Sequence, residues 1–232
     1  MLETTLECQK SLLDFGIEIK NLNILETALT HPTYSYEHGL TENNQRLEFL
    51  GDTVLSLIIV EYLYGKYPSK QEGELSKIKS VVVSGETLAQ GARKFKLYDY
   101  LLIGKGEEKV GGRYRDSVLA DAFEALLAAI YLDLGFNKVK EFVFQILDEI
   151  IEEIVTKGVR DYKTILQELL QKDYKKSVEY KVLAEKGPDH DKVFTVGLLW
   201  EDQVIAIGLG KSKKEAERQG AKIAIEYFLN KG

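Results

Sequence analysis

Two carboxylates interrupt an apolar helical pattern in the segment Asn44-Gln45-Arg46-Leu47-Glu48-Phe49-Leu50-Gly51-Asp52-Thr53-Val54-Leu55. Glu48 and Asp52 are four residues apart, so a helix places them one above the other on a single face. The apolar pattern continues to Tyr64 and stops before Pro68. We therefore expect one long helix from residue 44 to residue 64, with Asp52 in a mostly apolar part of it.

A second expected helix, over residues 117–133, repeats this feature. Asp121 and Glu124 are three residues apart within Val118-Leu119-Ala120-Asp121-Ala122-Phe123-Glu124-Ala125-Leu126-Leu127-Ala128-Ala129. Four carboxylates on apolar helices indicate a common partner, because desolvating an unpaired carboxylate costs several kcal/mol. Oxygen ligands without histidine or cysteine suit Mg²⁺, with Mn²⁺ as a substitute, rather than zinc. The sequence thus predicts a divalent-metal site built from two helices.

Two structural explanations compete with a metal site. Asp121 follows Ser117, a plausible N-cap, and a carboxylate in a first helical turn complements the helix macrodipole. The carboxylates could instead pair with Arg46, Arg113 or Arg115.

A bound divalent ion would polarise a phosphoryl oxygen and generate hydroxide from water. The metal interpretation therefore predicts phosphodiester hydrolysis.

Residues 1–156 as a whole are expected to form an all-α domain. Apolar residues three and four positions apart indicate further helices at 5–14, 22–30, 74–94 and 137–157. Residues 104–112 are rich in glycine and charge, and we expect a loop that is not ordered by itself. Glu72 could add a carboxylate to the site from a loop or a helix start. The alternative, a solvated glutamate in the first turn of a helix, explains the spacing at least as well.

The pattern changes at residues 157–160, which we interpret as a flexible linker. A short helix follows, and alternating apolar residues then indicate three strands, the first at 178–185 and the others around 194–200 and 204–208. A last helix is expected over 213–229. Residues 161–232 are therefore predicted to form a small α+β domain with the order α-β-β-β-α.

Lysines crowd the start of the last helix. Ser212-Lys213-Lys214-Glu215 has the form of a capping box, and Lys211 precedes it. Lysine is unfavourable at a helix N-terminus, so the cluster suggests an external anion, with a merely solvated basic turn as the alternative. Gln167 and Gln171 share the polar face of the first helix, where they suit contacts to 2′-hydroxyls and base edges in a shallow RNA minor groove.

Composition excludes several classes of protein. The 232 residues are 44% hydrophobic and contain one cysteine, which excludes wholesale disorder and a disulfide framework. Apolar runs stay far below the roughly 18 residues of a membrane span, and we expect a cytoplasmic protein without a secretory signal. The net charge of −6 is unevenly divided: residues 1–160 carry 18 Lys+Arg against 25 Asp+Glu, and residues 161–232 carry 13 against 12.

The segment 44–52 resembles the signature of the ribonuclease III family, and Ala120-Asp121-Ala122-Phe123-Glu124-Ala125-Leu126 resembles its second acidic motif. Residues 161–230, including the run at 208–217, are similar to a double-stranded-RNA-binding domain. The resemblance implies a Mg²⁺-dependent endonuclease, without another small-molecule cofactor, that cuts double-stranded RNA to leave 5′-phosphates and short 3′ overhangs. It also implies processing of structured ribosomal RNA precursors and of some messenger and other RNAs.

The resemblance assigns roles residue by residue. Metal ligands would be Glu48, Asp121 and Glu124, and the catalytic carboxylates would be Asp52 and Glu124. Glu72 matches a further family acid near the site, and His190 would enter a neighbouring minor groove. The family is homodimeric through the signature helix, which implies that Phe49 lies at the dimer interface and that each copy serves one strand of the duplex.

One position departs from the family pattern. Many members have glutamate where this chain has Gln45. Glutamine retains hydrogen bonding and loses a charge, so we expect intact chemistry with an altered substrate preference. Gln45 is also the best support for an alternative function, a non-cleaving duplex-RNA-binding regulator or ribosome-assembly factor. Against that alternative stand the other four acids, which a pure binding protein has no physical reason to keep on apolar helices.

Overall fold

The computed structural model describes residues 2–157, 162–175, 177–187, 192–201, 203–210 and 212–229. The chain divides into two compact units, Met1–Val159 and Arg160–Gly232, and each is described by itself. Most of the expected linker, residues 158–160, lies outside the described residues.

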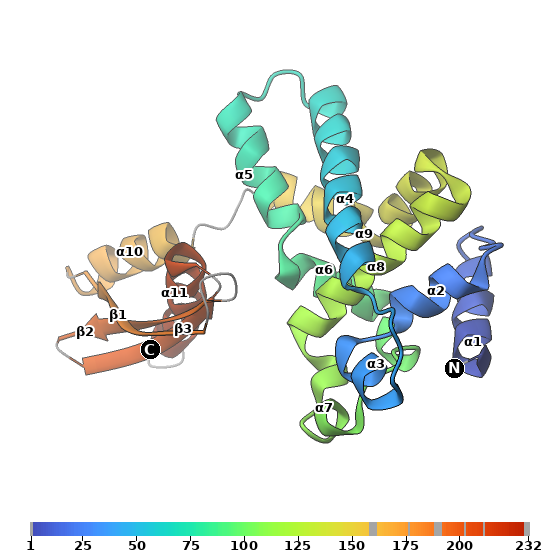
Figure 1. Ribbon diagram of the computed structural model, residues 1–232. Coiled ribbons are helices and arrows are strands. Elements are labelled where there is room, and N and C mark those ends of the chain that lie inside the picture. Colours follow the sequence, from blue (N-terminus) through green and yellow to red (C-terminus); the bar gives the residue numbers. More distant parts are fainter. Residues whose placement is uncertain are drawn as a thin grey trace. The chain divides into compact units, whose positions relative to one another are not determined.

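The first unit is helical throughout its described part (Figure 1). Its helices are α1 (Leu2–Leu13), α2 (Leu22–Leu29), α3 (Pro32–His38), α4 (Gln45–Lys66), α5 (Glu72–Val82), α6 (Gly85–Lys94), α7 (Lys105–Lys109), α8 (Asp116–Leu134) and α9 (Phe136–Lys157), with 3-10 turns η1 (Leu97–Asp99) and η2 (Gly112–Tyr114). This confirms the predicted all-α fold of the region.

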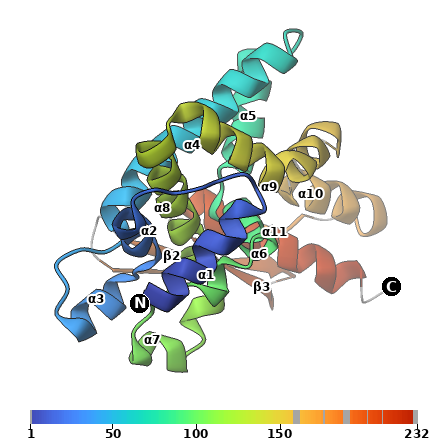
Figure 2. The same ribbon diagram turned by 90° about the vertical axis from the view of Figure 1, so that its right-hand side faces the viewer.

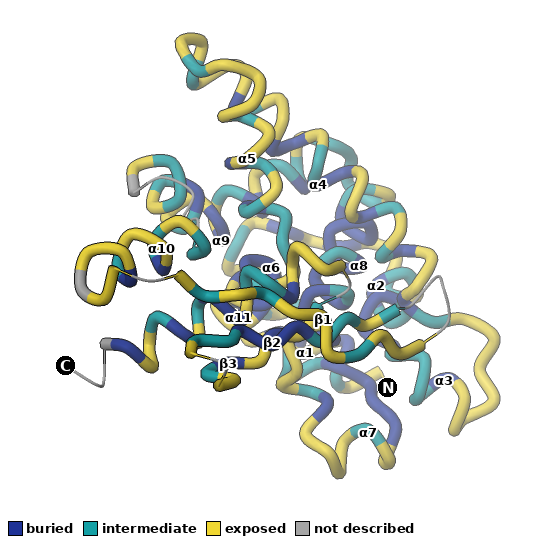
Figure 3. Tube along the Cα trace, turned by 90° about the vertical axis from the view of Figure 1, so that its left-hand side faces the viewer, coloured by how far each residue is buried: buried dark blue, intermediate teal, exposed yellow. Residues whose placement is uncertain are grey.

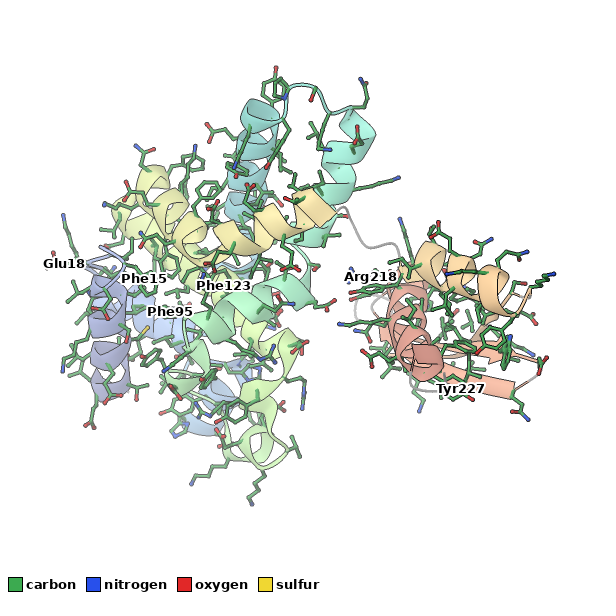
Figure 4. The ribbon with its side chains drawn as sticks, turned by 180° about the vertical axis from the view of Figure 1, so that it is seen from behind. Phe15, Glu18, Phe95, Phe123, Arg218 and Tyr227 are labelled. Atoms are coloured by element: carbon green, nitrogen blue, oxygen red, sulfur yellow. The ribbon has the colours of Figure 1, made fainter. Side chains whose placement is uncertain are left out.

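Helix α8 is the centre of this unit. It packs against α4, α6, α2 and α9 (Figure 2), and almost every residue from Val118 to Ile130 is buried. The two exceptions within that span are Asp121 and Glu124, which are half-buried. Aromatic rings complete the core on one side, where Phe15, Phe95 and Phe142 pack edge to face with centroids 5.6 Å apart (Figure 4 labels the first two). The acidic pair therefore lies on the most buried helix of the unit.

Local capping explains where the helices differ from the predicted ones. The expected helix 74–94 is two helices, because the Ser84 hydroxyl caps α6 by accepting a hydrogen bond from the Thr87 amide at 3.4 Å. Helix α3 was not predicted from the apolar pattern. It starts at Pro32 and ends at His38, and Gly39 follows it with a φ of 64° in the left-handed region.

The glycine-rich segment 104–112 is ordered, contrary to the predicted loop, and the order comes from α3. The Glu37 carboxylate accepts hydrogen bonds from the amides of Lys105 and Gly106, at 2.9 and 3.3 Å, at the start of α7. These two hydrogen bonds hold the pKa of Glu37 below its usual value. Further along, Arg113 pairs with Glu108 at 2.6 Å. The segment is thus held by side chains that no local pattern reveals.

The second unit is a three-stranded antiparallel sheet covered by two helices, which confirms the predicted α-β-β-β-α order. Its elements are α10 (Tyr162–Asp173), β1 (Glu179–Lys186), β2 (Val193–Trp200), β3 (Gln203–Gly210) and α11 (Lys213–Leu229). The register pairs Val182 with Val196 and Leu198 with Ala206. A Cβ on Gly208 would lie 1.9 Å from the Ala216 carbonyl oxygen, so α11 packs directly on the backbone of β3.

Candidate functional site

A glycine brings the two acidic helices together. A Cβ on Gly51 of α4 would lie 1.9 Å from the backbone oxygen of Glu124 and 2.5 Å from its carbonyl carbon. The α4 and α8 backbones therefore touch at the position that carries Glu124, and a side chain on residue 51 would separate them. Spacing and apolar pattern alone assign Gly51 no role. The glycine itself is a sequence signal for the contact. Glycine destabilises a helix interior, so its presence there indicates a position where another backbone approaches closely.

Three carboxylates meet beside this contact. Glu48, Asp121 and Glu124 each offer one oxygen, and these oxygens lie within 4.8 Å of one another. Two oxygens on one Mg²⁺ lie at most about 4.2 Å apart, twice an Mg–O distance of about 2.1 Å, so small side-chain rotations suffice to bind one ion. The donors are all carboxylates, which fits a hard divalent cation rather than zinc.

The structural explanations for these acids account for them only in part. Glu48 lies in the first turn of α4, where the macrodipole favours a carboxylate. Asp121 does not have this explanation, because α8 begins at Asp116 rather than after a Ser117 cap. Arg115 pairs with Glu107 at 2.9 Å, and Arg113 pairs with Glu108 at 2.6 Å.

The other predicted active-site residues lie outside the group of three. Asp52 is exposed one turn after Glu48, and Gln45 is exposed at the first position of α4. Glu72 is the first residue of α5 and accepts a hydrogen bond from the Ser76 hydroxyl at 2.7 Å. Because α4 separates Glu48 from Glu72, the two lie at opposite ends of a helix of 22 residues, roughly 30 Å long. Glu72 is therefore not one of the three carboxylates whose oxygens meet in this chain.

An apolar stripe follows the outer side of α4. Phe49 is 80% exposed, and Tyr64 is 78% exposed near the other end of the helix. Leu57 and Val60, both about half exposed, lie between them on the same side, within about 80° around the helix. Figure 3 shows how exposed the end of α4 and the adjoining α5 are. A hollow of about 820 Å³ next to Phe49 is lined mainly by residues of α2 and α4, with Leu132 of α8.

The second unit exposes the predicted RNA contacts that can be described. Gln167 and Gln171 line a shallow hollow on the polar face of α10. Lys213 and Lys214 are exposed in the first turn of α11, where the Ser212 hydroxyl accepts a hydrogen bond from the Glu215 amide at 3.2 Å. His190 and Lys211 lie outside the described residues.

Lys213 already has an anionic neighbour. Its ammonium group lies 3.2 Å from a Glu185 carboxylate oxygen of β1 and 5.6 Å from the centre of the Phe194 ring. The pair is largely exposed, so its net contribution to stability is small. A phosphate can therefore replace the carboxylate at little cost.

In the part of the chain that the structure describes, none of the helices is both long and apolar enough to cross a membrane. This observation agrees with the absence of long apolar runs in the sequence.

Comparison with known proteins covers both units. A Ribonuclease-III-like family model matches residues 21–150, and a double-stranded RNA binding motif matches residues 162–228. Ribonuclease 3 of Streptococcus pneumoniae strain P1031 is 50% identical over 218 residues, which are 93% of this chain and 94% of the relative. Strain Hungary19A-6 has a ribonuclease 3 with the same identity and coverage.

Solved structures match the first unit. A structure of the ribonuclease III nuclease domain from Campylobacter jejuni, described in terms of a flexible region involved in dimer formation, has a TM-score of 0.57 and 37% identity. The match covers 61% of this chain and 96% of that one. A second structure of that domain, at 2.2 Å resolution, has a TM-score of 0.56 and 36% identity, covering 62% and 92%. With the two matching family models and the 50% identical relatives, these findings establish that the chain belongs to the ribonuclease III family of double-stranded-RNA endoribonucleases.

Proposed function

We propose that Glu48, Asp121 and Glu124 hold Mg²⁺, with Mn²⁺ as a substitute, and that phosphodiester bonds of double-stranded RNA are hydrolysed there. The observation that carries this proposal is the meeting of three carboxylate oxygens within 4.8 Å on two packed helices. When bound, the ion supplies a Lewis acid that polarises a phosphoryl oxygen and makes water a better nucleophile.

The protein's own residues then have separate tasks. The three ligands determine where the scissile phosphate must lie, because they fix the ion relative to α4 and α8. Asp52, exposed on the next turn of α4, would accept a hydrogen bond from the attacking water and so orient it. Gln45 at the start of the same helix offers a neutral amide to the RNA, which affects substrate preference rather than chemistry.

The products and substrates follow from the family. We propose that cleavage leaves 5′-phosphates and short 3′ overhangs, and that cytoplasmic ribosomal RNA precursors are among the substrates. Two copies of the chain, joined through the apolar stripe on α4, would cut one strand each. Phe49 is the proposed centre of that interface, because it is a large exposed aromatic beside a hollow that Ile24, Leu50 and Leu132 help to line. Glu72, which lies beyond the other end of α4, would act from the second copy.

The second unit is proposed to supply most of the affinity for RNA. Gln167 and Gln171 would contact 2′-hydroxyls and base edges in one minor groove, and His190 the neighbouring one. Lys211, Lys213 and Lys214 would contact the phosphates between them. A near-neutral unit with clustered lysines suits this task better than the acidic first unit.

The decisive experiment compares Glu124→Gln with the unchanged protein on a labelled duplex RNA and on its single strand, with Mg²⁺ and then with EDTA. We expect the unchanged protein to cut only the duplex and only with Mg²⁺, and Glu124→Gln to bind the duplex without cutting it. Glu141→Gln removes an exposed carboxylate of α9 that pairs only with its neighbour Lys138 among the described residues, and it should cut normally. Full activity of Glu124→Gln would refute the assignment.

A further inference from the structure

An ion pair joins the two helices of the second unit. Lys163 of α10 and Glu217 of α11 approach to 2.7 Å between ammonium nitrogen and carboxylate oxygen. The side chains are 40% and 26% exposed, so the pair is partly shielded from water. The Lys163 ammonium group also lies over the Tyr180 ring of β1, 4.5 Å from its centre. One lysine thus connects both helices and the first strand.

Each partner lies one helical turn from a proposed RNA contact. Lys163 precedes Gln167 by four residues, and Glu217 follows Lys213 by four, so each partner shares a face with its neighbouring contact residue. Lys163 and Gln167 also line the same small hollow, of about 190 Å³, together with Tyr180. Helices α10 and α11 pack against each other, and Figure 4 labels Arg218, the residue after Glu217.

The two helices also share an apolar core. Ala216, Ala221, Ala224 and Phe228 of α11 and Leu166 and Leu170 of α10 are buried in one cluster, and α11 packs on the β3 backbone at Gly208. Apolar packing is not directional, whereas a charge-assisted hydrogen bond has a preferred length and direction. The ion pair therefore adds a directional constraint between α10 and α11 to the contacts of the apolar core.

We infer that the Lys163–Glu217 pair is a brace that sets the distance between the minor-groove contacts on α10 and the phosphate contacts on α11. Glu217 is then a positioning residue for duplex RNA, although its own charge opposes RNA. The inference rests on the proposed RNA-binding function of Gln167, Lys213 and Lys214. A duplex has a fixed spacing between minor groove and adjacent phosphates, so a binding surface held at that spacing pays less to bind.

The sign of one substitution separates a brace from simple electrostatics. Removing an anion from an RNA-binding unit should tighten binding if only charge matters. For Glu217→Gln in the full-length protein, the brace predicts the opposite, an affinity for a duplex of about 20 base pairs that is roughly threefold weaker, as expected for loss of a partly exposed ion pair. Lys163→Met should weaken binding similarly, and Lys163→Arg should restore it because arginine can keep the pair.

Glu226→Gln is the matched control, since it removes an exposed carboxylate of α11 far from the brace.

The second readout is whether the effects of the substitutions on duplex affinity add. In a Lys213→Ala, Lys214→Ala background the phosphate contact is lost, so Glu217→Gln should weaken binding no further, whereas a mere loss of stability would add its full effect. Fluorescence anisotropy with a catalytically silent Ca²⁺ buffer measures all of these affinities.

Two results would overturn the inference in different ways. If Glu217→Gln binds the duplex as tightly as Glu226→Gln or tighter, the brace is wrong while the proposed RNA surface stands. If the Lys213→Ala, Lys214→Ala variant itself binds normally, the proposed phosphate contacts are wrong and the brace falls with them. Three results together support the brace: weaker duplex binding by Glu217→Gln, restored duplex binding by Lys163→Arg, and no further loss of affinity when Glu217→Gln is added to the Lys213→Ala, Lys214→Ala variant.

Discussion

Replacing Gly51 by alanine tests the geometry of the site most directly. The new Cβ would start 1.9 Å from the Glu124 carbonyl oxygen, whereas ordinary contact begins near 3.4 Å. Because the obstacle is backbone, the clash is not relieved by rotating a side chain. The α4 and α8 helices must instead separate by about 1.5 Å at this point, the difference between those two distances.

The separation has two calculable consequences. Overpacking of this kind costs about 1–3 kcal/mol in the free energy of unfolding, and a backbone obstacle favours the upper end. It also moves Glu48 away from Asp121 and Glu124, whose oxygens now lie within 4.8 Å. A further 1.5 Å takes them to about 6.3 Å, well beyond the roughly 4.2 Å that one Mg²⁺ spans. A misplacement of about 1 Å at a catalytic centre can cost about 100-fold in rate.

The assay combines urea unfolding, Mn²⁺ binding by calorimetry and cleavage of a labelled duplex. Gly65→Ala is the matched control on the same helix, because a Cβ there meets nothing within 4 Å. Alanine is the better helix former, so Gly65→Ala should be neutral or stabilising by about 0.5 kcal/mol, with unchanged cleavage. If Gly51→Ala unfolds at the same urea concentration as the unchanged protein and cuts at the same rate, the helix contact does not set the site.

Three further predictions concern other surfaces. Phe49→Ala should raise the dimer dissociation constant at least tenfold in sedimentation equilibrium, whereas Tyr36→Ala, which removes an aromatic that is 89% exposed on α3, should leave it unchanged; equal values for both would exclude the α4 interface. Replacing Lys213 and Lys214 by alanine should flatten the plot of log affinity against log salt by about 0.7–0.9 per lost phosphate contact, and an unchanged slope would show that neither touches phosphate. The hydrogen bond from Arg113 lowers the pKa of Glu108 in the folded protein. The stability that ionised Glu108 contributes is therefore present above its unfolded pKa of about 4.5 and is lost as the pH falls below that value. Between pH 6 and pH 3 the urea midpoint of Glu108→Gln should drop less than that of the unchanged protein.

Local spacing predicted much of the site because the relevant geometry is local. The i, i+3 spacing of Asp121 and Glu124 places both on one face of any helix that contains them. Which helix faces them is a tertiary property, and it depends on Gly51 admitting the α8 backbone. The same logic explains Asp52. Spacing puts it on the face of Glu48, yet Asp52 is exposed and is not one of the three carboxylates whose oxygens meet.

The predicted helices and strands failed where order comes from distant partners. Residues 104–112 carry no apolar period, and their order depends on Glu37, roughly 70 positions earlier in the chain. Helix α3 is bounded by Pro32 and Gly39 but has too few apolar residues for a period to appear. The break at Ser84 was readable in principle, because serine three residues before Thr87 is a capping signal within an otherwise continuous apolar pattern.

The division of charge between the two units implies a link between metal and RNA. Residues 1–160 carry 18 basic against 25 acidic residues, and three of these carboxylates form the proposed metal site, which a phosphodiester would have to approach. A divalent cation there offsets this repulsion, so it raises affinity for the duplex, and thermodynamic reciprocity requires the duplex to raise affinity for the cation by the same factor. Residues 161–232, with 13 basic against 12 acidic residues, have no comparable repulsion to relieve. Duplex affinity of the unchanged protein should therefore rise with Mg²⁺ or with catalytically silent Ca²⁺. Glu124→Gln has lost one ligand and one negative charge, so its duplex affinity should rise less when the cation is added. An identical dependence in both proteins would mean that the cation acts on the RNA alone and that the three carboxylates take no part in it.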